Sequence, residues 1–321
     1  MLFRSVEPRG AAVFSAPVAD GGDVLIGNQR RLAAIDAATG GLLWLQDPVR
    51  RSEDFNSLAS LAISDGVAVG VFNREIGGVF AWERLTGRLL WHSGDSLSLS
   101  INSSPVIANG LVYFVNGATE VYARELQTGV LRWRTKLDPD GFDWAIATVG
   151  TPAIARGILV VPTLWNELVG IDATSGLVRW RFGAQPGPLR TTHYRGRDEA
   201  GFSASPVITG DIVWAIDTSG RLTALALETG ALVWGTELDA PVLGGLATSG
   251  DWLVVAAYDG TIRGMRRAPT ERRAVVAARC DQPAASAGCC QAGAADASPL
   301  VVVLVAGYAR RRRRRRRSAT A

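Results

Sequence analysis

Two adjacent cysteines, Cys289 and Cys290, have the sharpest potential chemistry in the chain and lie in the stretch SAGCCQAG. Neighbouring Cα atoms are about 3.8 Å apart across a trans peptide, which is below the usual disulfide separation. A disulfide between them would strain the chain and would need a rigid surround. The flanking sequence predicts no such surround, so we expect no catalytic role for this pair.

A second group of reactive side chains lies in GAQPGPLRTTHYRGRDEAGF, residues 183–202. Long loops on rigid scaffolds often carry function, and several cationic and aromatic side chains here suit an anionic or peptide ligand. The alternative interpretation is a solvated loop, which we favour. The candidate ligand residues are Arg190, His193, Tyr194, Arg195 and Arg197.

Other kinds of site are poorly supported by the sequence. The chain has only two histidines, His92 and His193, which nearly excludes a histidine-based metal cluster. No glycine-rich phosphate loop follows a strand and opens a helix, and no nucleophile elbow is present.

The elements that would position any site come from an internal repeat. The stretch IDAATGGLLW, residues 35–44, returns in four variants, and its anchor tryptophans are 47, 42, 47 and 54 residues apart. This period suits a four-stranded propeller blade. Short β-branched runs separated by Gly, Asp or Asn precede each anchor, as expected for strands and hairpin turns. The anchors are Trp44, Trp91, Trp133, Trp180 and Trp234.

Each repeat carries a Thr-Gly or Ser-Gly turn ahead of its tryptophan. A tight turn between two strands needs a positive φ, which glycine adopts at little cost. We expect the tryptophan to cover the neighbouring blade and to donate its N–H to a carbonyl. A carboxylate precedes the turn in four repeats, and Ala226 replaces it in the fifth. The turn glycines are Gly40, Gly87, Gly129, Gly176 and Gly230.

The sequence therefore predicts an all-β propeller of four-stranded blades, with five complete blades and a truncated sixth. The pattern A-x-D-x-x-T-G-x-x-x-W over roughly residues 11–265 resembles the tryptophan-docking motif of the PQQ-like, or quinoprotein, β-propeller repeat family. That family includes pyrroloquinoline-quinone (PQQ) alcohol dehydrogenases and the propeller lipoprotein of outer-membrane assembly. The resemblance implies the fold strongly and the activity weakly.

The resemblance also implies what an enzyme of this family would need. A quinone site takes calcium held by carboxylate and amide ligands, an Asp base, and a disulfide between adjacent cysteines against the cofactor. Cys289 and Cys290 lie beyond the repeats, and no spacing singles out a ligand set. We therefore expect no cofactor, with PQQ and calcium as the alternative. The candidate ligands are Asp140, Asp143, Asn166 and Glu167.

The repeat stops near Met265, where the sixth unit loses its turn and its tryptophan. The segment MLFRSVEPRG lines up with VRWRFGAQPG, which places Phe3 against Trp180, so residues 2–6 are a candidate outer strand for the sixth blade. The alternative is a piece of a seven- or eight-bladed parent. We assign residues 1–265 to the propeller and 266–321 to an Ala/Arg-rich tail that is disordered or frame-shifted.

Charge separates these two parts. Residues 1–265 carry 21 basic and 27 acidic side chains, a balance of −6, whereas the tail carries 13 basic and 3 acidic, a balance of +10. The high isoelectric point belongs to the tail, so we predict no specific nucleic-acid binding by the propeller.

No signal peptide is visible. The apolar run LVVVLVAGYA is too short to span a bilayer. Localisation is not indicated, and a parent protein outside the cytoplasm is compatible with the family.

Three functions remain open. The favoured one is a rigid, non-catalytic scaffold that binds a protein partner or another domain of its parent polypeptide. The second is a fragment of a PQQ-dependent dehydrogenase. The third is the sensing or substrate-positioning propeller of a longer hydrolase or kinase. The sequence indicates no oligomeric state.

Overall fold

The computed structural model describes fourteen stretches of the chain. They are residues 16–27, 31–46, 59–72, 78–94, 103–116, 120–137, 150–163, 167–184, 201–238, 240, 242, 245–257, 259–266 and 301–302. Within these residues every regular element is a β-strand, and the strands form six antiparallel sheets of four strands each. The predicted all-β propeller with about six blades is confirmed.

The first three blades follow the chain in order from the innermost to the outermost strand. Blade one is β1 (Val18–Asp20), β2 (Asp23–Gly27), β3 (Leu32–Asp36) and β4 (Leu42–Gln46). Blade two is β5 (Ala62–Ser64), β6 (Val67–Phe72), β7 (Gly78–Glu83) and β8 (Leu89–Ser93). Blade three is β9 (Val106–Ala108), β10 (Leu111–Val115), β11 (Glu120–Glu125) and β12 (Leu131–Lys136).

The other three blades keep this order. Blade four is β13 (Ala153–Ala155), β14 (Ile158–Pro162), β15 (Glu167–Asp172) and β16 (Val178–Gly183). Blade five is β17 (Val207–Thr209), β18 (Ile212–Ile216), β19 (Arg221–Ala226) and β20 (Leu232–Glu237). Blade six is β21 (Leu246–Ser249), β22 (Trp252–Ala256), β23 (Ile262–Arg266) and β24 (Val301–Val302).

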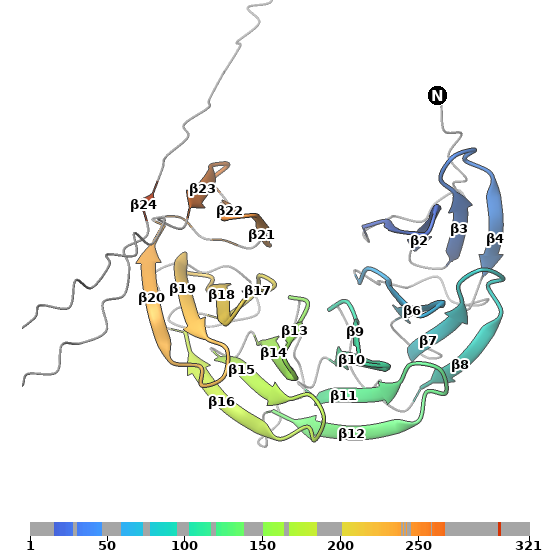
Figure 1. Cartoon of the computed structure of the whole chain (residues 1–321), viewed down its shortest axis with the longest axis horizontal. Coiled ribbons are helices and arrows are strands. Elements are labelled where there is room, and N and C mark those ends of the chain that lie inside the picture. Colours follow the sequence, from blue (N-terminus) through green and yellow to red (C-terminus); the bar gives the residue numbers. More distant parts are fainter. Residues whose placement is uncertain are drawn as a thin grey trace, which may run out of the picture.

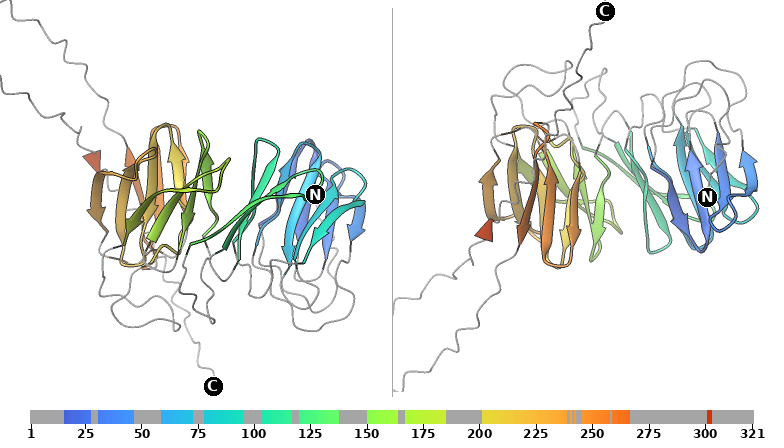
Figure 2. Two further views of the ribbon diagram at one scale, coloured as in Figure 1. Left: turned by 90° about the horizontal axis from the view of Figure 1, so that it is seen from below. Right: turned by 90° about the horizontal axis from the view of Figure 1, so that it is seen from above.

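The blades stand side by side along an arc. Figure 1 shows the short strands β9, β13 and β17 on the inner side, the tryptophan-bearing strands β4, β8, β12, β16 and β20 on the outer side, and the first and sixth blades apart at the two ends of the arc. In the edge-on views of Figure 2 the strands run between the two faces of this arc.

Each junction between neighbouring blades has a hydrophobic core of its own. Between blades three and four, for example, Val121 and Trp133 pack with Leu159 and Val169, all of them buried. Four further clusters of the same kind fill the junctions of blades one and two, two and three, four and five, and five and six. Alternate residues of a strand therefore face the blade before and the blade after, which explains why the middle strands are apolar on both faces.

The outer strand of blade six departs from the sequence expectation. Residues 2–6 were one candidate for the strand beside β23, but they lie outside the described residues, and the neighbour of Met265 and Arg266 is β24. This strand has two residues and comes from the segment that we assigned to the tail. The prediction missed it because pairing with partners 35 and 37 residues away leaves no local sequence signal. The division of the chain at residue 265 remains a prediction.

Candidate functional site

The anchor tryptophans lie at equivalent places in their blades. Each pairs across the outer two strands with a small residue: Ala34 with Trp44, Ala81 with Trp91, Ala123 with Trp133, Gly170 with Trp180 and Ala224 with Trp234. The register shifts directly after this pair in all five blades, which marks a β-bulge in the outer strand. Beside the bulge, the residue two positions before the tryptophan is exposed in all five blades.

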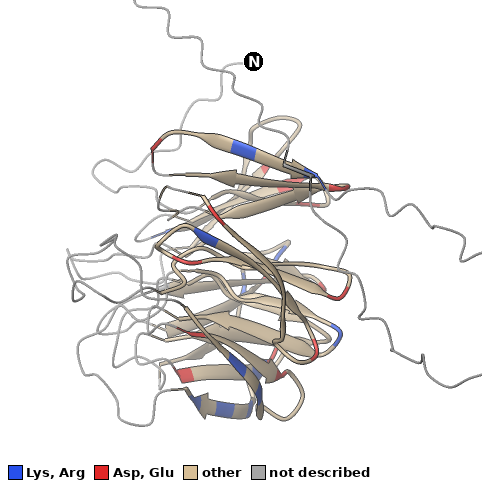
Figure 3. Ribbon diagram, turned by 90° about the vertical axis from the view of Figure 1, so that its left-hand side faces the viewer, with Lys and Arg blue, Asp and Glu red and all other residues tan. Residues whose placement is uncertain are grey.

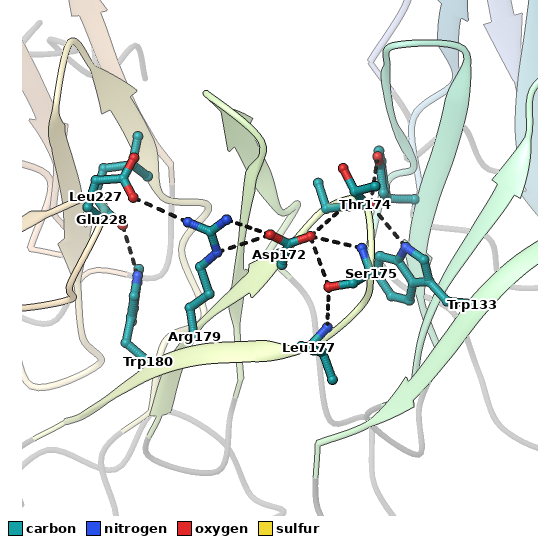
Figure 4. Close-up of polar contacts among 11 residues, drawn as sticks. Trp133, Asp172, Thr174, Ser175, Leu177, Arg179, Trp180, Leu227 and Glu228 are labelled. Carbon is teal, nitrogen blue, oxygen red and sulfur yellow. Dashed lines mark hydrogen bonds and ion pairs between the residues drawn. The ribbon is translucent and has the colours of Figure 1, made fainter.

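The contact between Trp133 and blade four shows the geometry (Figure 4). Trp133 Nε1 donates a hydrogen bond of 2.9 Å to the carbonyl oxygen of Ala173, and Tyr113 Oη donates to the same oxygen at 3.2 Å. The ring lies over Gly176, where an added Cβ would come within 2.6 Å of Trp133 Cδ2. Since Gly176 also has a φ of +76°, both the turn and the ring above it require glycine here.

Three other junctions repeat this contact. The indole nitrogens of Trp44, Trp91 and Trp180 each donate to a carbonyl oxygen of the following blade at 2.8 Å. The acceptors are the carbonyls of Arg84, Leu126 and Leu227, and the glycines beneath the rings are Gly87, Gly129 and Gly230.

The fifth tryptophan and the first turn glycine stand at the ends of the series. Trp234 is half-buried and meets Trp214 edge to face, with ring centroids 6.3 Å apart. The backbone position equivalent to Ala173 in blade six is residue 267, which lies outside the described residues. Gly40 has a φ of +73°, and no described blade precedes the one to which it belongs.

The carboxylates before the turns serve the turns themselves. Asp172 Oδ1 accepts hydrogen bonds from the backbone nitrogens of Thr174 and Ser175, and its second oxygen accepts from Arg179. Arg179, together with Ser175, holds the pKa of Asp172 well below its ordinary value. Arg179 also reaches Glu228 of blade five at 3.3 Å, so this turn is tied to the next blade as well (Figure 4).

Equivalent hydrogen bonds from threonine lower the pKa of the corresponding carboxyls in blades one to three, namely Asp36, Glu83 and Glu125. Blade five has Ala226 at this position. Its turn nevertheless keeps the two backbone hydrogen bonds of the other turns, Gly230 to Ala226 and Ala226 to Ala231, both 2.8 Å long. The backbone therefore closes the turn, and the carboxylate adds to it.

The sequence analysis missed a residue that forms ion pairs between two blades. Arg84 of blade two forms ion pairs with Asp20 and Asp23 at the first turn of blade one, while its own carbonyl accepts the Trp44 hydrogen bond. Blades one, three, four and five have Ala37, Leu126, Ala173 and Leu227 at this position. The available sequence signal was that Arg84 is charged, whereas these four equivalent residues are apolar.

A buried carboxylate was also missed. Asp217 follows β18 and is 2% exposed, and its Oδ1 accepts hydrogen bonds from the backbone nitrogens of Ser219 and Arg221 and from the Ser219 hydroxyl. Burial raises the pKa of Asp217 above its ordinary value despite these three donors. The sequence DTSGR predicts a turn here but gives no measure of burial.

Most of the predicted chemical residues lie outside the described residues. This applies to Arg190, His193, Tyr194, Arg195 and Arg197, to Asp140, Asp143 and Asn166, and to Cys289 and Cys290. Glu167 is described, at the start of β15, where its carboxylate pairs with Arg181 of β16. A guanidinium on these oxygens does not fit a calcium ligand. Among the described residues no group of three His, Cys, Asp or Glu side chains is placed to hold a metal ion.

The outward side of the outer strands exposes aliphatic side chains. They recur in blades one to five close to the bulge beside each tryptophan, and we call this set the outer rim. The outer rim comprises Leu42, Leu43, Leu45, Leu89, Val130, Leu131, Val178, Leu232 and Val233. In the view of Figure 3 acidic and basic residues are interspersed along the described strands.

Comparison with known proteins then decides the family. Residues 4–164 and 166–273 match the family model described as outer membrane protein assembly factor BamB. The chain belongs to this family. No helix among the described residues is long and apolar enough to cross a membrane.

Individual relatives agree with this assignment. The outer membrane protein assembly factor BamB of Yersinia pestis is 24% identical over 234 residues, which cover 69% of this chain and 56% of the relative. The crystal structure of BamB from Moraxella catarrhalis superposes with a TM-score of 0.62 at 13% identity, over 80% of this chain and 74% of that one. Quinohemoprotein alcohol dehydrogenase from Comamonas testosteroni has a TM-score of 0.60 at 15% identity, over 80% and 53%.

The two structural likenesses show a shared fold. The chain spans just over half the length of the Yersinia pestis relative, so the activity and partners of a whole assembly factor come to this chain only by proposal.

Proposed function

We propose that this chain is a non-catalytic propeller scaffold that binds a protein partner during the assembly of outer-membrane proteins, outside the cytoplasm. The observation that supports it most is the use made of the repeated polar groups. Four tryptophan N–H groups bind carbonyls of the next blade, and the repeated carboxylates close their own turns. Because these groups are used to hold the blades and turns together, we expect a partner to bind to the exposed surface of the propeller.

The outer rim supplies one such surface among the described residues. Its side chains expose apolar area at the same position, two residues before the tryptophan, in successive blades, for example Leu42 at 47%, Leu89 at 49% and Leu131 at 43%. Exposed apolar surface bordered by charged residues is typical of protein-binding surfaces. A partner of the scaffold would cover it along the outer strands.

The dehydrogenase alternative needs a preorganised cation site and a stacking surface for the quinone. Glu167 is the one candidate ligand among the described residues, and it is paired with Arg181. The likeness to the alcohol dehydrogenase concerns the fold, which many activities share. We therefore favour the scaffold.

The proposal is tested in a bacterium from which its own BamB gene has been deleted. The chain is expressed with an export signal fused to it, and the amount of folded outer-membrane protein is measured. We expect partial restoration by the unchanged chain, and loss of it in the double variant Leu131→Glu/Leu232→Glu with the melting temperature (Tm) preserved. Leu85→Glu, at an exposed turn position outside the rim, serves as the control. No restoration by an exported, folded chain would contradict the proposal.

A further inference from the structure

Blade one carries a docking surface like the one that receives Trp133 in blade four. In blade four the turn has hydrogen bonds from Gly176 N to Asp172 O and from Asp172 N to Leu177 O. Blade one has the same pair, from Gly40 N to Asp36 O at 2.8 Å and from Asp36 N to Gly41 O at 2.9 Å.

The acceptor carbonyl is matched as well. The backbone nitrogen of Ala173, whose carbonyl receives Trp133, is bonded to Gly157 O at 2.9 Å. Ala37 N is bonded to Gly22 O at 2.8 Å in the equivalent place. The carbonyl of Ala37 and the turn at Gly40 are therefore arranged to receive an aromatic ring, as four other turns in the described chain do.

The sheet beside this turn is apolar. Val24 pairs with Ile35 and Ile26 pairs with Ala33, and these four side chains are half-buried. We call them the leading face of blade one. In blade four the equivalent residues are fully buried against blade three; they are Leu159, Val161, Val169 and Ile171. The leading face thus has the composition of a blade junction, although no described blade adjoins it.

The chain contains a segment with the right sequence at the right distance. Phe3 of MLFRSVEPRG aligns with the tryptophan of VRWRFGAQPG. Fifteen residues separate Phe3 from Val18, the first residue of β1, and fifteen also separate Trp91 from Val106, the first residue of β9. The separation of Phe3 from Gly40 is 37 residues, against 38 between Trp91 and Gly129.

We propose that residues 2–6 dock against the leading face of blade one, with the Phe3 ring over Gly40. Docking buries an aromatic ring and part of an apolar sheet face that water would otherwise cover. Phenylalanine lacks the indole N–H, so the Ala37 carbonyl receives no hydrogen bond from it. The inference is independent of the scaffold function, because it concerns what covers the leading face of blade one.

The test uses the full chain and three variants. Phe3→Ala should make amide hydrogen exchange in β2 and β3 roughly tenfold faster, while β14 and β15 of blade four stay unchanged. Phe3→Trp should raise the Tm by roughly 2–4 °C, since the indole restores a hydrogen bond to Ala37. Phe14→Trp, the same change eleven residues later, is the control and should give no increase.

The position of the Phe3 ring is tested by making Phe3→Ala in two variants of the chain, Gly40→Ala and Gly87→Ala. A Cβ at residue 40 would displace the ring, so Phe3→Ala should have little further effect in Gly40→Ala and its full effect in Gly87→Ala. Equal effects of Phe3→Ala in both backgrounds, or unchanged exchange in β2 and β3, would overturn the proposal. Protection of blade one that rises with protein concentration and ignores Phe3→Ala would assign the face to a second copy and would also overturn it.

Discussion

The carbonyl oxygen of Ala173 accepts hydrogen bonds from both Trp133 and Tyr113 of the preceding blade. Replacing Trp133 by Ala should lower the free energy of unfolding by about 3–5 kcal/mol, because a large buried ring is lost. Trp133→Phe should cost only about 1 kcal/mol. The phenyl ring still fills most of the space of the indole, and Tyr113 still donates a hydrogen bond to the Ala173 carbonyl. Denaturant unfolding measures both, with Leu177→Ala as a surface control. A loss below about 1 kcal/mol for Trp133→Ala would refute the docking contact.

Asp217 should make stability depend on pH in the opposite sense to the turn carboxylates. Its folded pKa is raised by burial, so its contribution to stability is complete below the unfolded value, about 3.9, and is lost as the pH rises through the folded value. We therefore expect Asp217→Asn to be more stable than the unchanged chain at pH 7, with the difference shrinking toward pH 4.

Asp259 provides the matched control for this prediction. Its Oδ1 accepts hydrogen bonds from Thr261, which hold its pKa below the ordinary value. Its contribution is therefore present above the unfolded pKa and lost as the pH falls, and Asp259→Asn should destabilise at pH 7. Urea unfolding at pH 7 and pH 4 gives both differences. The same sign for the two variants at pH 7 would contradict the burial argument.

At the scale of the elements, the junction of blades one and two depends strongly on one side chain, Arg84, which forms ion pairs across it. Arg84 and Asp23 are about 15% and 14% exposed, so their ion pair is partly shielded from water. We expect Arg84→Met to lower the free energy of unfolding by about 1–2 kcal/mol. Arg88→Met removes an exposed pair with Glu83, which water screens, and should cost clearly less. Equal urea midpoints for the two variants would show that Arg84 does not join the blades.

The strands and turns could be predicted because their signals are local. A glycine before each tryptophan and β-branched runs between turns indicate the hairpins of the described strands β1 to β23 without knowledge of the neighbouring blade. The pairing of β24 with β23 and the ion pairs of Arg84 with Asp20 and Asp23 arise only when distant segments meet. No short window of sequence encodes them. The burial of Asp217 was missed for the same reason.

At the scale of the whole molecule, stability should be a sum over blades and junctions, since each junction has a separate core. The candidate site was less predictable than the fold. Glu167 illustrates why: its residue type suits calcium, but the cross-strand Arg181 takes its oxygens. Each repeat of the sequence carries the same strand and turn signals, so the fold can be predicted from any of them. A ligand site depends instead on side chains that converge from several blades.

The charge partition predicts a separate behaviour of the C-terminal segment. Residues 310–317 are eight consecutive arginines, and each phosphate that they neutralise releases counterions. The full chain should therefore bind DNA or RNA without sequence preference, with an affinity that falls steeply with salt. Deleting residues 310–317 should abolish this binding in a fluorescence-anisotropy titration. Binding retained by the deletion variant at the same salt concentration would show that the acidic propeller itself binds nucleic acid.

The most direct measurement of the scaffold account is a quinone-binding experiment on the purified chain. The protein is incubated with pyrroloquinoline quinone and calcium and passed through gel filtration, and dye reduction is followed with several alcohols and sugars. The account predicts that the quinone elutes apart from the protein and that no dye is reduced. Stoichiometric co-elution of quinone with calcium-dependent turnover would contradict it and would establish the chain as part of a dehydrogenase.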